Sequence, residues 1–205
     1  MLVFGVISPH PPIIIPEIGG REIEKVQKTI SALEAAAEKM ADTKPEKLLI
    51  IAPHTEHGYE VPLYYLGKDL PRQTKLEKIL VTNPSYQHYF DLGKQYGAEI
   101  ARTKQRTAVI ASGDLSHVLK AEGPYGYDPA GPQLDKLIVQ AIKEKDVEGL
   151  LTIDQELLMN GAECGLRSIL FLFGVFAESN YTTEVLSYEG PFGVGYMVAT
   201  FNVIP

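Results

Sequence analysis

Two stretches, MLVFGVISPH at residues 1–10 and KLLIIAPHT at residues 47–55, indicate the fold. Each contains a short run rich in Leu, Ile and Val, at Leu2–Ile7 and Lys47–Ala52, that is stopped by a proline, as expected of buried parallel strands. Between them, apolar residues recur at three- and four-residue steps across Arg21–Ala41, which predicts an amphipathic helix. Strand, helix and strand in this order predict a right-handed crossover within one sheet.

The rest of the chain continues this alternation of strands and helices. The expected elements are strands at Val61–Leu66 and Lys78–Val81, a helix from Asn83 to about Thr103, a strand at Thr107–Ser112, two or three helices within Gln133–Ser179 that end with the apolar Leu166–Ala177, and strands at Glu184–Tyr188 and Gly195–Val203. The sequence therefore predicts an α/β fold: a single domain, residues 1–205, with a central, mostly parallel or mixed sheet flanked by helices on both faces.

Composition narrows the class of protein. A chain of 205 residues with 45% apolar and 22% charged residues can close one hydrophobic core. The net charge of -7 is spread along the chain without a basic stripe, so nucleic acid is not an expected partner. The longest apolar run, Ile169–Ala177, is far below the ~20 residues that span a bilayer, so no membrane partner is expected. The lone Cys164 and an N-terminus unlike a signal peptide predict a cytoplasmic protein.

Three of the five histidines follow predicted strands at equivalent places. His10 follows the first strand, His54 the second, and His117 the strand at Thr107–Ser112. In open α/β sheets, ligands bind at the carboxyl ends of the strands, so histidines placed alike predict one shared site. Two imidazoles with one carboxylate suit a divalent first-row metal and leave coordination positions open.

Glu163 is the carboxylate that this pattern favours. In NGAECGLRS (160–168) it lies near the first turn of the apolar helix, where the helix dipole favours the ionised form that a metal needs. A glutamate that only decorates the helix start is an equal alternative. The adjacent Cys164 is either a small buried apolar residue or a softer ligand, and a thiolate would favour Cu or Zn over Fe(II).

Several other residues are candidates for supporting or substrate-contacting roles. Asp114 either orients His117 or bonds its own turn. His57 is expected in solvent, with support of the site as its minor alternative. Tyr125, in the loop at Glu122–Pro132, is either a lid residue or part of a packed loop.

The glycine-rich GPFGVGY at residues 190–196 lacks the lysine and helix start of a phosphate loop. It is better interpreted as a close approach to the final strand, with Phe192 and Tyr196 lining a pocket.

Four ordered segments carry a resemblance: GVISPHPPIIIPEIGG (5–20), IIAPHT (50–55), ASGDLSH (111–117) and NGAECGLRS (160–168). Together they resemble the catalytic subunit of class III extradiol dioxygenases, the LigB-like superfamily typified by protocatechuate 4,5-dioxygenase. The chain is most similar to the dioxygenase-like domains of the AmmeMemoRadiSam group and, more distantly, resembles Memo proteins. The resemblance spans nearly the whole chain.

Residue by residue, the resemblance implies that His10 and His54 are imidazole ligands, Glu163 is the carboxylate ligand and His117 is the acid/base. It implies a non-haem Fe(II) enzyme that cleaves a catechol- or aminophenol-type aromatic with O2. The alternative is a Memo-like protein that binds Zn, Cu or Fe without oxygenase activity and serves a modification or assembly pathway. A homo-oligomer, dimer or larger, is expected in either case.

Overall fold

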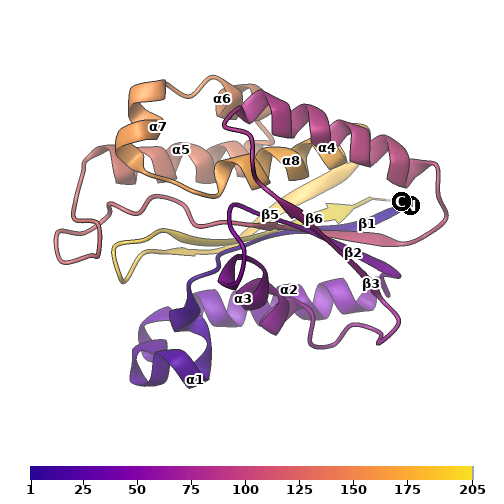
Figure 1. The fold of residues 1–205 in the computed structure, drawn as a ribbon, viewed down its shortest axis with the longest axis horizontal. Helices are drawn as coiled ribbons and strands as arrows, with labels where there is room; N and C mark the ends of the chain where they lie inside the picture. Colours follow the sequence, from indigo (N-terminus) through magenta and orange to yellow (C-terminus); the bar gives the residue numbers. More distant parts are fainter. Residues whose placement is uncertain (205) are drawn as a thin grey trace.

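Parallel strands occupy the centre of a six-stranded sheet. In the computed structural model, which describes residues 1–204, the strand order is β3-β2-β4-β1-β6-β5 (Figure 1). The parallel strands are β1 (Leu2–Ser8), β2 (Lys47–Ala52), β3 (Lys75–Leu80) and β4 (Thr107–Ser112). The antiparallel strands β6 (Tyr196–Val203) and β5 (Tyr181–Glu189) complete the sheet beyond β1. The predicted α/β fold with a mostly parallel, mixed sheet is confirmed.

Both faces of the sheet are buried, and this explains the continuous apolar runs in its central strands. Side chains alternate between the two faces along each strand. In β2, Leu49 and Ile51 pack into one hydrophobic cluster, while Leu48 and Ile50 pack into the other. A strand with one face in water would show alternating apolar and polar residues. The unbroken apolar run therefore correctly indicated a strand that is buried on both faces.

Helices cover both faces of the sheet (Figure 1). One face carries α1 (Pro16–Gly19), α2 (Gln27–Asp42) and α3 (His57–Leu66), with 3-10 turns at Pro12–Ile14 and Gly20–Val26. The other face carries α4 (Tyr86–Ala101), α5 (Ala130–Glu144), α6 (Val147–Leu151), α7 (Gln155–Gly161) and α8 (Leu166–Phe176). Apart from Arg167, every residue of α8 is buried, as its apolar sequence predicts.

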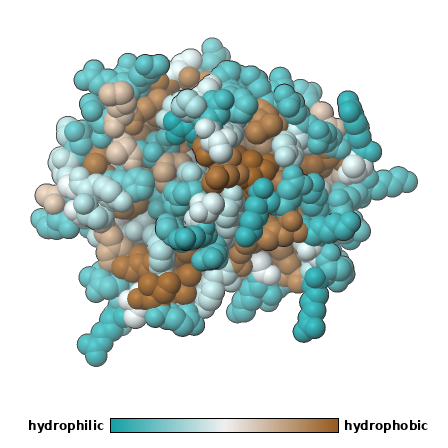
Figure 2. Space-filling view, in the orientation of Figure 1, coloured by the Kyte–Doolittle hydropathy of each residue, from teal (hydrophilic) through white to brown (hydrophobic). Residues whose placement is uncertain are grey.

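The surface shown in Figure 2 is mostly hydrophilic, with a brown apolar patch over α1. Ile18 of this short helix is 62% exposed. Within residues 1–204, no helix combines the length and the apolar character needed to cross a bilayer.

The strand predicted at Val61–Leu66 is wrong, because these residues form the second half of α3. Val61, Tyr65 and Leu66 are buried at helical spacing, while Tyr64 is 43% exposed. The aromatic and β-branched composition resembles a strand, but packing against α2 selects the helix. Pro62 lies inside this helix and lacks the N–H that would bond the carbonyl of Gly58.

Other boundaries shift without changing the topology. The helix predicted at Arg21–Ala41 starts with a 3-10 turn, and its α-helical part begins at Gln27. The N-cap of α4 is Ser85, whose hydroxyl accepts from the His88 amide. Two or three helices were predicted within Gln133–Ser179, but the structure has four from Ala130 onward, because α6 and α7 are separate short helices.

Candidate metal centre

His10 and His54 meet at the carboxyl edge of the sheet because only one strand separates the two strands that precede them. In the strand order, β4 lies between β2 and β1. His10 follows β1, His54 follows β2, and their ring centroids are 4.5 Å apart. His57, in the first turn of α3, has its ring centroid 4.9 Å from that of His54.

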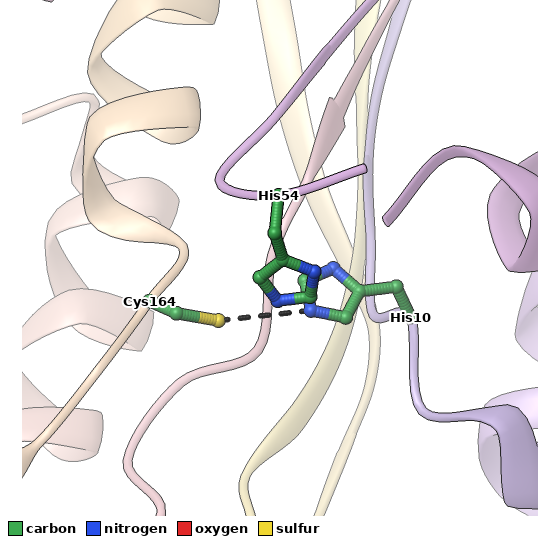
Figure 3. A group of neighbouring side chains, drawn as sticks. All are labelled: His10, His54 and Cys164. Carbon is green, nitrogen blue, oxygen red and sulfur yellow. Dashed lines mark hydrogen bonds between the residues drawn. The ribbon is translucent and has the colours of Figure 1, made fainter. Parts of the chain in front are cut away.

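Cys164 joins this pair of imidazoles. The ligand atoms of His10, His54 and Cys164 all lie within 4.8 Å of one another (Figure 3). Cys164 Sγ is 3.8 Å from His10 Nε2. A second group, formed by Asp114, His117 and Cys164, meets the same distance limit and shares the sulfur. The thiol therefore lies between two sets of potential metal ligands.

The His10 ring is held in one tautomer by hydrogen bonds. Ser112 Oγ donates its only hydrogen to the Gly58 carbonyl at 2.5 Å, so it can only accept from His10 Nδ1, which is 2.9 Å away. Nδ1 consequently carries the hydrogen, and Nε2 presents its lone pair toward the thiol. This is the arrangement that metal-binding histidines adopt, with one nitrogen bonded to a partner and the other free for the metal.

Burial, followed by the charges of the neighbouring imidazoles, lowers the pKa of His10 to about 3. The side chain of His10 is 3% exposed and therefore neutral over the ordinary pH range. Burial, and after it the charge of Asp114, raises the pKa of the Cys164 thiol. A bound cation would supply the missing positive charge and favour the thiolate. The neutral imidazole of His10, the neighbouring imidazole of His54 and the buried thiol of Cys164 are a ligand set that fits a first-row transition metal.

A contact between two glycines fixes the backbone at Cys164. A Cβ atom on Gly113 would lie 2.1 Å from the Cα of Gly165, so the loop after β4 crosses the turn before α8 without space for any side chain. The amides of Cys164 and Gly165 donate to the Asp114 carbonyl at 3.3 and 2.9 Å. These contacts seat the thiol beside the histidines.

Asp114 ties the His10 loop to this crossing. Its Oδ1 accepts from the His10 amide at 3.0 Å, and its own amide donates to Cys164 Sγ at 3.3 Å. Burial raises the pKa of Asp114 to about 6. Among residues 1–204 this carboxylate makes no hydrogen bond to His117 or to its own turn, the two predicted roles, and it positions the His10 backbone instead.

His117 is also held in one tautomer. Its Nδ1 donates to the Ala162 carbonyl, which also accepts the His117 amide at 3.2 Å. Ala162 has a left-handed backbone with φ of 48°, and this turn aims the carbonyl at the ring. Nε2 is left with its lone pair. The ring of Tyr125 lies edge-on to His117, with centroids 5.2 Å apart, although Tyr125 is 67% exposed.

Glu163 faces away from this cluster, which differs from the predicted arrangement. Its Oε1 accepts from the Tyr86 hydroxyl at 2.9 Å, and its Oε2 accepts from the Leu166 amide at 2.5 Å. Arg167 Nη1 lies 3.8 Å from Oε1. Burial raises the pKa of Glu163. Across residues 1–204, neither group of potential ligands contains Glu163, and Cys164 stands where the carboxylate was expected.

The remaining predicted residues lie at different places outside the two ligand groups. His57 is near His54 but belongs to neither ligand group found in the described part of the chain. Tyr196 is 2% exposed, and burial followed by the charge of Asp114 raises its pKa. Phe192 packs on the α2 side of the sheet, where Lys25 Nζ lies 5.8 Å from its ring centroid.

Sequence reasoning missed Ser112, Tyr86 and Arg167. Arg167 could have been found, since it follows Glu163 by four residues, the spacing at which helical side chains of opposite charge meet. Ser112 and Tyr86 act through contacts with residues 54 or more positions away, and no local pattern encodes such contacts.

Comparison with known proteins gives a consistent family. The profile of the catalytic LigB subunit of aromatic ring-opening dioxygenase matches residues 54–199. Protein CA_C1420 of Clostridium acetobutylicum is 29% identical over 261 residues, which cover 94% of this chain and 56% of that protein. The chain thus spans about half the length of this curated relative.

A solved structure, the uncharacterized protein JW3007 from Escherichia coli K12, shares the fold. It matches with a TM-score of 0.54 and 10% identity, over 97% of this chain and 99% of that one. At this identity the likeness concerns the fold alone.

Proposed function

The chain belongs to the family of the catalytic LigB subunit of aromatic ring-opening dioxygenases, and from this premise we propose that it is a metal-dependent enzyme that opens the ring of a small aromatic diol or aminophenol with O2. His10, His54 and Cys164 would hold the metal, and three protein ligands leave positions for substrate. Such an ion, when bound, supplies Lewis acidity and a path for electrons between the aromatic ring and oxygen.

The observation that carries the proposal is the free nitrogen of His117. Its Nδ1 is bonded to the Ala162 carbonyl, so Nε2 can accept a proton from a substrate hydroxyl. Asp114 and Cys164 have ligand atoms within 4.8 Å of the His117 ring nitrogen that faces them. The imidazole can return the same proton to the product, because both oxygen atoms of O2 enter the opened ring and no net proton is consumed. A purely structural metal site has no need of such a group.

Oxygen uptake after anaerobic reconstitution tests this function. Protein loaded with Fe(II) should consume O2 with at least one member of a panel of catechols and aminophenols. His117→Ala should keep its metal and lose at least about 100-fold in turnover, since general acid–base catalysis contributes about 10²–10⁴-fold. His88→Ala, which removes an exposed imidazole on α4, is the matched control and should retain turnover. Absence of uptake with every metal and substrate contradicts the proposal.

The thiol favours a second candidate, a metal-binding protein of the same family without oxygenase activity. A soft sulfur ligand in place of a carboxylate shifts preference from Fe(II) toward Cu or Zn. Competition between the three metals for the wild-type protein measures this preference. Tight retention of Zn or Cu, together with no O2 uptake in any metal form, would support the second candidate over the first.

A further inference from the structure

A pocket of about 690 Å³ lies on the other side of the segment that carries Cys164. It is bounded by the first turns of α4 and α8 and by α7, which lie close together in Figure 1. Ala162 and Glu163 form the wall nearest to the metal centre, and none of the three candidate metal ligands lines the pocket. We propose that this pocket binds a small carboxylate with an apolar body, and that Arg167 is its anchor.

Arg167 is already oriented for such a ligand. Its guanidinium carbon lies 4.4 Å from the ring centroid of Tyr86, and its Nε donates to the Pro84 carbonyl at 3.0 Å. Both contacts restrain a side chain that would otherwise lose much rotamer freedom on binding. The side chain is 24% exposed, so it remains accessible from solvent.

The terminal nitrogens of Arg167 have hydrogen-bonding capacity to spare. In the part of the chain that the structure describes, neither makes a hydrogen bond of ordinary geometry, although Arg167 lies close enough to the Tyr86 hydroxyl to lower the pKa of that group, which burial raises. The nearest carboxylate, Glu163, is 3.8 Å away, and each of its oxygens already accepts from another donor, Tyr86 or Leu166. A planar guanidinium with free N–H groups is the side chain best matched to a carboxylate, which it can bind through two parallel hydrogen bonds.

The pocket wall opposite Arg167 favours a ligand whose remaining part is apolar. Leu151, Ile153, Leu158 and Met159 line the pocket, and Met159 is 76% exposed at its rim. A volume of about 690 Å³ falls within the range of ordinary small-molecule sites. Together, the anchor and the wall fit an aromatic or branched aliphatic carboxylate. A polyanion such as a nucleotide fits poorly, because Arg167 is the one cationic side chain among the lining residues.

Binding of 4-fluorobenzoate, followed by ¹⁹F NMR, tests the proposal. The wild-type protein should give saturable binding, and neutral 4-fluorobenzamide should bind at least about tenfold more weakly, because hydrogen bonds between charged groups are roughly twice as strong as neutral ones. Arg167→Gln should weaken benzoate binding by at least about tenfold, which corresponds to 1.4 kcal/mol. Arg21→Gln, at an exposed position outside the pocket, should bind like the wild type.

Two further variants keep the test decisive. Met159→Glu adds a negative charge at the exposed rim without touching the Glu163 network, and should weaken benzoate binding even if Arg167→Gln fails to fold. His10→Ala should lose metal but still bind benzoate, which separates this pocket from the metal centre and from the proposed function. The proposal is overturned if the wild type shows no saturable binding, if the amide binds as well as the acid, if neither pocket variant weakens binding, or if His10→Ala abolishes it.

Discussion

Glu163 and Cys164 are adjacent in sequence, yet they serve two different places in the molecule. The thiol of Cys164 lies among imidazoles at the carboxyl edge of the sheet, while the carboxylate of Glu163 lies with Tyr86 and Arg167 beside a pocket. Glu163 has a donor for each oxygen, whereas Cys164 Sγ and the nearby Nε2 of His10 face each other at 3.8 Å. The short hydrogen bonds to both oxygens of Glu163 and the long, weak contacts of the Cys164 sulfur separate a structural carboxylate from a candidate ligand.

Replacing each of these two side chains separately tests their roles, and the loss of the thiol has the largest expected effect on metal affinity. Cys164→Ala should reduce metal affinity on the order of a thousandfold, beyond the 10–100-fold typical of groups that only orient a ligand. Glu163→Gln should change metal affinity by less than about tenfold, because its carboxylate faces the pocket. Metal competition with a chromophoric chelator measures both variants. If Glu163→Gln loses metal and Cys164→Ala keeps it, the two roles are reversed.

The glycine crossing that separates the two places can be broken directly. Gly113→Ala should lower the free energy of unfolding by about 3 kcal/mol, because its methyl group would meet backbone at Gly165. Gly126→Ala is the control for backbone conformation alone: its φ is 78° with open space around it, and it should cost about 1 kcal/mol. Urea denaturation measures both. Equal losses of unfolding free energy in the two variants would show that the close approach of Gly113 to Gly165 does not account for the effect.

Asp135, like Glu163, is a buried carboxylate that accepts hydrogen bonds from a backbone amide and from a tyrosine. It accepts from the Ser116 amide at 2.7 Å and from the Tyr188 hydroxyl at 2.6 Å, and burial raises its pKa to about 6. Because the folded state holds this proton more tightly than the unfolded state, the stabilisation is present below the ordinary pKa of 3.8 and is lost as the pH rises through 6.

The asparagine in Asp135→Asn cannot titrate. The difference in the free energy of unfolding between the wild type and this variant should therefore fall by about 2 kcal/mol between pH 4.5 and 7.5. Denaturation curves of both proteins at the two pH values provide the difference. A constant difference across this range would show that Asp135 titrates normally in the fold.

Replacing Ser112 should have the smallest effect on metal affinity, because this residue orients a candidate ligand and does not itself bind the metal. Ser112→Ala removes the acceptor of His10 Nδ1–H and should weaken metal binding by about tenfold, as expected for a partner that orients a ligand. Ser168→Ala is the matched control, since this buried hydroxyl has no hydrogen-bond partner among the described residues. Its metal affinity should match the wild type, and a similar loss in both variants would refute a specific role for Ser112.

The sequence predicted the central strands β1, β2 and β4 because they are buried on both faces and leave an unbroken apolar signal. From those strands it followed that His10 and His54 end at one edge. It favoured Glu163 over Cys164 as the side chain that faces that edge, whereas the structure has the thiol there. A single step along the backbone reverses the direction of a side chain here, and the step is set by contact between Gly113 and Gly165, which lie far apart in sequence.

The same limit explains the error in α3. Local composition at Val61–Leu66 resembles a strand, and only packing against α2 shows that the buried residues share one helical face. Long-range contacts therefore decided both the one wrong element and whether Glu163 or Cys164 faces the histidines, whereas local patterns were sufficient for the central strands of the sheet.

Pro62 sets the stability of α3 against the orientation of His10. Because proline leaves the Gly58 carbonyl without its helical donor, that oxygen is available to Ser112, which in turn orients His10. Replacing Pro62 by alanine would restore a donor to α3, and the regained backbone bond would compete for the acceptor on which the imidazole depends. A thermostability screen would thus reward the substitution that loosens His10, so the imperfect helix keeps the geometry of the candidate metal centre at the expense of its own stability.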